Sequence, residues 1–247
     1  MGGGRHPAGD ATPCFDDTPP VHGSHPIRIA PSLLSADFAH LADEIRSVED
    51  AGADWLHLDV MDGHFVPNLT IGPPVVKAIA RAATRPLDVH LMIDDPWTYV
   101  PRFLEASPHV VSIHLEVALR RPDEAGLLLE SIRAAGSLAG VAFNPDQDPH
   151  ALRPFVSAVD LVLVMSVFAG FGGQSFMPEV LDRPAVLRRD LGYRGEIEID
   201  GGIGPATIAA AAAAGVNAFV AGTAVFGAPD RAARIAELRA LARAASA

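Results

Sequence analysis

Histidine and aspartate alternate with apolar residues in short runs of the chain. His57 and Asp59 lie in LHLDVM, His90 lies in VHLM, and Asp200 ends EID. Successive side chains of a strand point to opposite faces, so His57 and Asp59 share one face while the neighbouring leucines share the other. An imidazole and a carboxylate are costly to bury without partners. The pattern therefore predicts that these side chains converge on one polar site.

Two imidazoles and two carboxylates are a suitable ligand set for a divalent metal ion. Nitrogen and oxygen ligands of this kind suit Zn, Fe, Mn or Co, and the set does not choose among these metals. The alternative is that each histidine is an internally hydrogen-bonded core residue. So many polar groups at strand ends favour a functional site. We expect one divalent metal ion, held by His57, Asp59, His90 and Asp200.

The two aspartates also indicate a proton-transfer reaction. Inverting a carbon next to a carbonyl group requires one proton to leave one face and another to arrive on the opposite face. Asp59 and Asp200, on opposite sides of a planar enediolate, would exchange the roles of acid and base with the direction of the reaction. A metal ion would polarise the carbonyl group. Met61, Met92 and Met165 either wall the intermediate or simply pack the core.

Glycine-rich segments after three later strand candidates predict a phosphate site. These segments are Gly170-Phe171-Gly172-Gly173, Gly201-Gly202 and Gly222-Thr223. Glycine lets the backbone approach an anion closely, and helix N-termini bind phosphate through backbone N–H groups. One glycine cluster is usually only a turn, but three at adjacent strand ends favour a phosphate group on the substrate. Ser32, after the first strand, either hydrogen-bonds the substrate or caps a turn.

The elements that must position these residues alternate between strands and helices. The strand candidates are Ile27–Ala30, Trp55–Met61, Leu87–Met92, Val110–His114, Ala139–Phe143, Leu161–Ser166, Glu196–Asp200 and Ala218–Ala221. The helix candidates are Asp37–Ala51, Pro73–Ala82, Trp97–Ala106, Pro122–Ala135, Pro205–Ala214 and Pro229–Ala245, with two less regular helices after Phe143 and Phe176. Alternating βα units predict an α/β fold, a closed (β/α)8 TIM barrel with its active site at the carboxyl ends of the strands. An open doubly wound sheet is the alternative fold.

Length and composition fit a single catalytic domain. The chain has 247 residues, of which 49% are hydrophobic and 20% charged, and a barrel of this type takes about 250 residues. Residues 27–247 are expected to form the barrel. Residues 1–26 lack a hydrophobic period and are expected to form a flexible N-terminal tail. The formal net charge of −11 argues against nucleic-acid binding, which needs a basic face.

The remaining composition predicts a cytoplasmic protein without a membrane partner. Cys14 is the lone cysteine, which excludes an internal disulfide and a Cys-rich zinc site. Residues 1–25 lack the apolar run of a secretion signal. The uncharged stretch 206–228 is rich in alanine and interrupted by glycine. We therefore interpret it as a buried helix, a turn, a strand and a loop, and not as a membrane span.

Around these residues the sequence resembles the ribulose-phosphate 3-epimerase family. The runs PSLL, LHLDVMDGHFVPNLTIGP, DVHLM, MSVFAGFGGQSF and IDGGI match the family in the expected order, and the resemblance covers residues 27–240. It implies a barrel of the ribulose-phosphate-binding type, a homo-oligomer, and Asp59 and Asp200 as an acid/base pair that also binds metal with His57 and His90. It implies substrate contacts from Ser32, His90, Gly170, Phe171, Gly172, Gly173, Asp200, Gly201, Gly202, Gly222 and Thr223.

One segment departs from the family pattern. The family usually carries Asn-Pro before the glycine loop, whereas this chain has Phe168-Ala169. Proline fixes the backbone angle φ, so its loss is expected to loosen the loop. Phe168 also replaces a polar amide with a bulky ring. The metal and acid/base residues match the family, so we expect the chain to be active.

The leading functional hypothesis is epimerisation at carbon 3 of a pentulose 5-phosphate, which interconverts D-ribulose 5-phosphate and D-xylulose 5-phosphate in the pentose phosphate pathway. The same reaction on a hexulose 6-phosphate such as allulose 6-phosphate is an alternative, because pocket depth sets the length of the sugar. A non-catalytic phosphosugar-binding barrel is a further alternative, motivated only by Phe168-Ala169. We interpret His64 and His114 as non-ligands, while Asn144 either orients a loop or contacts the substrate.

Overall fold

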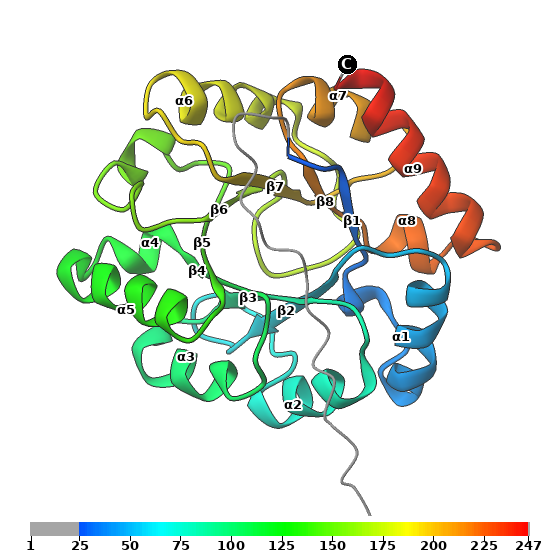
Figure 1. Ribbon diagram of the computed structural model, residues 1–247, viewed down its shortest axis with the longest axis horizontal. Helices are drawn as coiled ribbons and strands as arrows, with labels where there is room; N and C mark the ends of the chain where they lie inside the picture. Colours follow the sequence, from blue (N-terminus) through cyan, green and yellow to red (C-terminus); the bar gives the residue numbers. More distant parts are fainter. Residues whose placement is uncertain (1–24, 247) are drawn as a thin grey trace, which may run out of the picture.

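Eight parallel strands form a barrel in the computed structural model, which describes residues 25–246 (Figure 1). The strands are β1 Arg28–Ala30, β2 Leu56–Met61, β3 Leu87–Met92, β4 Val110–His114, β5 Leu138–Phe143, β6 Leu161–Met165, β7 Glu196–Asp200 and β8 Ala218–Val220. From β2 to β8 each strand pairs with the next in the chain, and β8 pairs with β1. A parallel bridge between Ser32 and His57 joins the ends of the sheet. The predicted TIM barrel is therefore confirmed.

The helices lie outside the strands and follow them in turn around the barrel (Figure 1). They are α1 Leu41–Asp50, α2 Pro73–Ala82, α3 Pro96–Leu104, α4 Leu115–Ala118, α5 Pro122–Ala134, α6 Arg183–Arg189, α7 Ile208–Ala213, α8 Thr223–Phe226 and α9 Arg231–Ala245. Short 3-10 helices occur at Leu33–Ser35, Phe38–His40, Pro149–Leu152 and Pro178–Asp182. Local sequence explains several starts. Proline occupies the first turn of α2, α3 and α5, where its missing N–H costs no hydrogen bond.

Two helices differ from the sequence-based expectation. The helix expected from Asp37 begins as a 3-10 turn, because the Asp37 side chain accepts the N–H of Ala39, and α1 starts only at Leu41. After Phe143 the structure has a single 3-10 turn and no α-helix. Three prolines fall in residues 145–154, and each removes a backbone donor that a helix needs.

Each strand packs one face against the helices and the other inside the barrel. In β2, Leu56, Leu58 and Val60 pack in the main hydrophobic core, as their alternation predicts. The barrel interior carries a smaller apolar cluster that includes Leu161, Leu163 and Met165. The interior also holds polar side chains that are 0% exposed, namely His57, Asp88, His90, Ser112 and Glu198. The fold thus buries a polar group of side chains within the strands.

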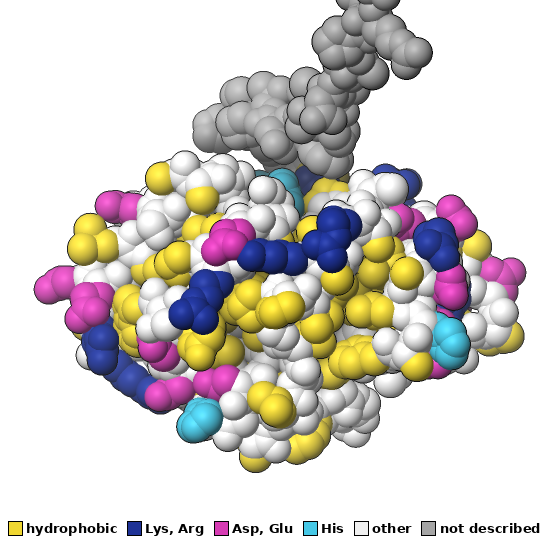
Figure 2. Space-filling model, turned by 90° about the horizontal axis from the view of Figure 1, so that it is seen from below, with side chains coloured by type: hydrophobic (Ala, Val, Ile, Leu, Met, Phe, Trp, Pro, Cys, Tyr) yellow, Lys and Arg dark blue, Asp and Glu magenta, His cyan; other side chains and the backbone are white. Residues whose placement is uncertain are grey.

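The outer surface carries charged side chains, and the uncharged stretch forms short elements. On the face shown in Figure 2, acidic and basic side chains are interspersed with apolar ones. The stretch 206–228 contains the expected helix and strand, α7 and β8, but the short helix α8 takes the place of the expected loop. Among residues 25–246, no helix has the length and apolar character needed to cross a membrane. Cys14 and residues 1–24 of the expected tail lie outside the described residues.

Candidate active site

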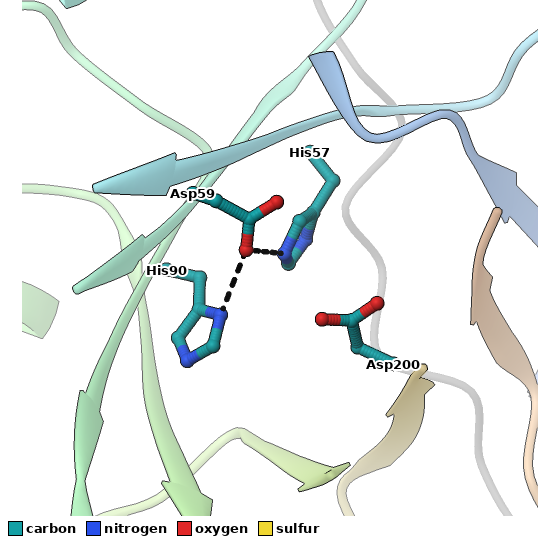
Figure 3. A group of neighbouring side chains, drawn as sticks. All are labelled: His57, Asp59, His90 and Asp200. Atoms are coloured by element: carbon teal, nitrogen blue, oxygen red, sulfur yellow. Dashed lines mark hydrogen bonds and ion pairs between the residues drawn. The ribbon is translucent and has the colours of Figure 1, made fainter. Parts of the chain in front are cut away.

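The four candidate metal ligands come from β2, β3 and β7 and lie close together (Figure 3). One ligand atom from each of His57, Asp59, His90 and Asp200 lies within 4.8 Å of those of the other three. Asp59 Oδ1 lies 3.3 Å from His57 Nε2 and 3.3 Å from His90 Nδ1. Figure 3 shows Asp200 facing this group from β7. The fold therefore assembles all four side chains that the strand pattern singled out.

The register between β2 and β3 explains this convergence. Asp59 lies opposite His90 in the parallel pair, and His57 lies opposite Asp88. Inward-facing residues recur at every second position, so the inner faces of the two strands line up residue by residue. Strand alternation thus places two imidazoles beside one carboxylate without any loop being involved.

The environment drives the two acidic members of the cluster toward different protonation states. Burial raises the pKa of Asp59, but interactions with His57 and His90 outweigh burial and hold this pKa below its ordinary value. Burial, together with the charge of Asp59, raises the pKa of Asp200 to about 7. Burial also lowers the pKa of His90 to about 4. Two carboxyl groups whose pKa values are pushed apart are typical of acid/base catalysis.

The donor atoms of the cluster fit a divalent metal ion. His57 Nε2 is buried and has no hydrogen-bond partner. Its other nitrogen, Nδ1, is bonded to the carboxylate of Asp88, and such a partner fixes the ring of a metal-binding histidine. Burial lowers the pKa of His57, but the charges of Asp88 and Asp59 raise it well above its ordinary value. A cation at the centre of the cluster would bind Nε2 and compensate the charges of these carboxylates.

Two buried carboxyl groups in the barrel were missed by the sequence analysis. Asp88 and Glu198 lie two residues before His90 and Asp200, and therefore share their inward faces. With His57 they form a second group of side chains able to hold a metal ion. Neither oxygen of Glu198 has a hydrogen-bond partner, although Oε1 lies 4.0 Å from His57 Nδ1, and burial raises the pKa of Glu198 well above its ordinary value. The alternation that identified Asp59 would have identified both residues.

A pocket of about 570 Å³, including the part open to solvent, lies over the cluster. Asp59 and Asp200 line it, and so do Met61, Met92 and Met165. The predicted substrate-binding residues that line it are Ser32, Gly170, Phe171, Gly172, Gly173, Asp200, Gly201, Gly202, Gly222 and Thr223. His57 and His90 are not among the lining residues. The fold therefore brings the three glycine-rich segments and both aspartates to one cavity.

Glycine is required on the pocket wall at close backbone contacts. Gly201 and Gly202 adopt φ values of 122° and 61°, which disfavour any residue with a Cβ. Gly222 has no such φ, but a Cβ there would lie 2.5 Å from Ser35 Oγ. Gly222 precedes α8, and no side chain caps this helix. The free N–H groups at the start of α8 are thus available to an anion in the pocket.

A comparison of the sequence with known protein families identifies the family of this barrel. The model of the ribulose-phosphate 3-epimerase family matches residues 28–226, which include every candidate ligand and every pocket glycine. The chain belongs to the ribulose-phosphate 3-epimerase family.

Curated relatives within the epimerase family match nearly the whole chain. The ribulose-phosphate 3-epimerase of Mycobacterium tuberculosis is 50% identical over 222 residues, which cover 88% of this chain and 94% of that protein. The enzyme of the same name from Bacillus subtilis is 44% identical over 219 residues, covering 86% and 98%.

Solved structures with the same fold are more distant in sequence. The 3-hexulose-6-phosphate synthase of Salmonella typhimurium has a TM-score of 0.65 and 16% identity, over 89% of this chain and 100% of that chain. KGPDC from Streptococcus mutans has a TM-score of 0.66 and 11% identity, over 90% and 100%. At these identities the similarity supports the barrel fold alone.

The loop that departs from the epimerase family pattern is held by hydrogen bonds at several points. The N–H of Ala169 donates to Asn144 Oδ1 at 2.9 Å, and a proline at this position would have no such donor. Asn68 Nδ2 donates to the carbonyl oxygen of Gly170 at 2.8 Å. Gln174 Nε2 donates to two further carbonyl oxygens of the loop, at 2.7 and 2.9 Å. These bonds restrain the loop at the place where the missing proline was expected to loosen it.

The remaining polar residues differ in their relation to the cluster. Ser32 Oγ donates to Asp59 Oδ2 at 2.6 Å and also accepts the N–H of Leu34 at 3.3 Å, so it both contacts the cluster and caps a turn. His64 lies in neither group of candidate ligands. His114 is 1% exposed and also lies outside both groups, but its Nε2 is 2.9 Å from Nε2 of His90. Ser32 and His114 therefore contact residues of the candidate metal site.

Proposed function

We propose that this chain is a metal-dependent epimerase that interconverts D-ribulose 5-phosphate and D-xylulose 5-phosphate. The observation that carries the proposal is the cluster of two carboxyl groups and two imidazoles beneath a pocket with glycine-rich walls. Membership of the ribulose-phosphate 3-epimerase family supports the reaction. The relatives named for this reaction, up to 50% identical, favour the pentulose over a hexulose 6-phosphate.

The two aspartates perform the proton transfers in this proposal. Asp59, whose pKa is low, removes the proton from carbon 3 on one face of the sugar. Asp200, whose pKa burial raises to about 7 in the metal-free chain, delivers a proton to the opposite face. In the reverse direction the two residues exchange roles. Ser32 keeps Asp59 in place through its hydrogen bond.

In this proposal the metal site polarises the substrate, and the pocket walls bind its phosphate and pack against the intermediate. We assign His57, Asp59, His90 and Asp200 as ligands of one divalent ion, Zn, Fe, Mn or Co, which when bound would polarise the carbonyl group and stabilise the developing negative charge. The three glycine-rich segments bind the phosphate through backbone N–H groups. Met61, Met92 and Met165 place apolar surface beside the planar intermediate.

Proton NMR of ribulose 5-phosphate in D2O tests the reaction and its mechanism together. We expect deuterium at carbon 3 and the appearance of xylulose 5-phosphate with metal-loaded protein, and neither after chelation. Asp59→Asn and Asp200→Asn should each abolish the formation of xylulose 5-phosphate, because inversion needs a proton carrier on both faces. Asp123→Asn changes an exposed aspartate of α5 and should leave both signals unchanged. Near-normal formation of xylulose 5-phosphate in either active-site variant would rule out the two-carboxylate scheme.

Three further assignments remain predictions with their own measurements. The ratio of kcat/KM for ribulose 5-phosphate to kcat/KM for allulose 6-phosphate tests the pentulose preference. A homo-oligomer, which the family resemblance implies, is tested by light scattering of the purified chain. A cytoplasmic location is tested by fractionation of cells that express the chain.

A further inference from the structure

A chain of hydrogen bonds leads from the candidate metal site to the loop on the pocket wall. His90 Nε2 lies 2.9 Å from His114 Nε2, and His114 Nδ1 lies 3.2 Å from Glu116 Oε2. The other oxygen of Glu116 accepts from the backbone N of Asn144 at 3.1 Å and from its Nδ2 at 2.7 Å. Asn144 Oδ1 accepts the N–H of Ala169 at 2.9 Å. Four contacts therefore connect a candidate metal ligand with the loop.

Donors and acceptors determine the bond directions of this series when a cation is bound. The N–H of Ala169 can only donate, so Asn144 turns its oxygen to the loop and its nitrogen to Glu116. With a cation bound at His90 Nδ1, which faces Asp59, the proton of His90 lies on Nε2 and is donated to His114 Nε2. His114 then carries its own proton on Nδ1, because the carboxylate of Glu116 can only accept. These bonds therefore favour the tautomer of His90 that leaves the Nδ1 lone pair for a cation.

The hydrogen-bonded side chains next to the cluster are shielded from water, so a donor without an acceptor is costly there. His90 is 0% exposed and His114 1% exposed. The Phe65 ring packs on His114 with 4.5 Å between ring centroids, and the Glu116 side chain is 15% exposed. In such surroundings hydrogen bonds are strong, and two donors that face each other carry a large penalty.

We propose that His114, Glu116 and Asn144 are positioning residues, of which His114 and Glu116 hold His90 in its metal-binding tautomer and Asn144, itself bonded to Glu116, holds the loop at Ala169. This inference rests on the proposed function, because it concerns the same site. The last link exists only because residue 169 has an N–H. In a chain with proline at this position the φ angle would be fixed covalently and this bond would be absent. Here the hydrogen bond to Asn144 supplies the restraint.

Glu116→Gln tests the hydrogen bonds next to His90. The glutamine oxygen stays with Asn144, where it accepts two bonds, so its NH2 group faces the N–H of His114. His114 then shifts its proton to Nε2 and drives the proton of His90 to the nitrogen that faces the cluster. We expect the affinity for Co2+, read from visible absorption without substrate, to fall about 10- to 100-fold. Glu130→Gln, an exposed glutamate of α5, is the matched control and should keep the wild-type affinity.

Asn144→Ala tests the hydrogen bond that holds the loop at Ala169. The change removes the acceptor of the Ala169 N–H but leaves the carboxylate that orients His114. We expect KM for ribulose 5-phosphate to rise about 2- to 10-fold, with Co2+ affinity within about twofold of wild type. In an Ala169→Pro background, Asn144→Ala should change KM much less, because the donor is already gone.

Imidazole 15N NMR of the Zn2+-loaded protein reads the tautomers directly and needs no turnover. The wild type should show His114 protonated at Nδ1 and His90 at Nε2, and Glu116→Gln should move the His114 proton to Nε2. Wild-type tautomers and wild-type Co2+ affinity in Glu116→Gln would overturn the role of His114 and Glu116, and an unchanged KM in Asn144→Ala would overturn the role of Asn144. Absence of epimerase turnover in the wild type would instead refute the proposed function, while the tautomers and Co2+ affinities would still test the positioning of His90.

Discussion

Gly202 is a position where one added methyl group probes the shape of the pocket. Its φ of 61° lies in the left-handed region, which costs a residue with a Cβ about 1–2 kcal/mol. A Cβ at this position would lie 2.6 Å from the backbone N and 2.9 Å from the Cα of Phe176. Backbone atoms cannot rotate away, and overpacking of this kind costs about 1–3 kcal/mol. The strain introduced by Gly202→Ala is therefore about 2–5 kcal/mol.

This strain is relieved by moving two pocket walls apart. Gly202 follows β7, while Phe176 follows the loop that carries Gly170 and Gly173. A tenfold change in binding corresponds to about 1.4 kcal/mol, so we expect KM for ribulose 5-phosphate to rise at least about tenfold. We also expect the melting temperature to fall by about 4 °C or more. Steady-state kinetics with saturating metal and scanning calorimetry measure the two effects.

Gly204→Ala is the matched control for this experiment. A Cβ at Gly204 would meet only Ala224 Cβ, at 3.6 Å, which is an ordinary van der Waals contact. This variant should keep the KM and melting temperature of the wild type. If Gly202→Ala behaved in the same way, the argument that close backbone packing at Gly202 shapes the pocket would be refuted.

Three further predictions concern the pH dependence of stability, the core and the loop. The pKa of Asp200 in the folded chain is about 7, above its ordinary value of 3.8. The folded chain therefore keeps a proton that the unfolded chain releases between about pH 4 and 7, so raising the pH lowers stability. The melting temperature of the metal-free wild type should therefore fall relative to Asp200→Asn between about pH 4 and 7, and a constant difference would contradict this. Glu49, 8% exposed, accepts three hydrogen bonds from residues 84–85, so Glu49→Gln should lower the free energy of unfolding by about 1–2 kcal/mol in urea titrations and leave kcat unchanged. Asn68→Ala removes the bond to the Gly170 carbonyl and should raise KM about 2- to 10-fold with little change in kcat; an unchanged KM would show that this bond does not position the loop.

The metal cluster is the part of the site that strand alternation predicts best. His57, Asp59 and His90 sit within regular strands, where side-chain direction follows from the count of residues alone. The parallel register then brings them together, because Asp59 faces His90 across β2 and β3. The same rule predicts that Asp88 and Glu198 face the barrel interior, although the sequence analysis had not used these residues.

The hydrogen-bond chain to the loop was beyond prediction from sequence. Glu116 lies just after β4 and Asn144 just after β5, where the backbone leaves the regular strand and side-chain direction no longer follows from spacing. The partners of Asn144 come from positions 28 residues before it and 25 after it, so they depend on the complete barrel. The missing helix after Phe143 has a simpler cause, because the prolines of residues 145–154 were visible in the sequence and their effect was underestimated.

The pairing of β1 with β8 has a consequence for the synthesis of the protein on the ribosome. All four candidate ligands have been made once residue 200 is joined to the chain, but β8 begins only at Ala218. β8 lies between β7 and β1, so until it is made these two strands have unpaired edges, which invite pairing with other chains. The growing chain thus contains all four candidate metal ligands before the barrel can close. The edges of β7 and β1 stay open to aggregation until β8 is inserted between them.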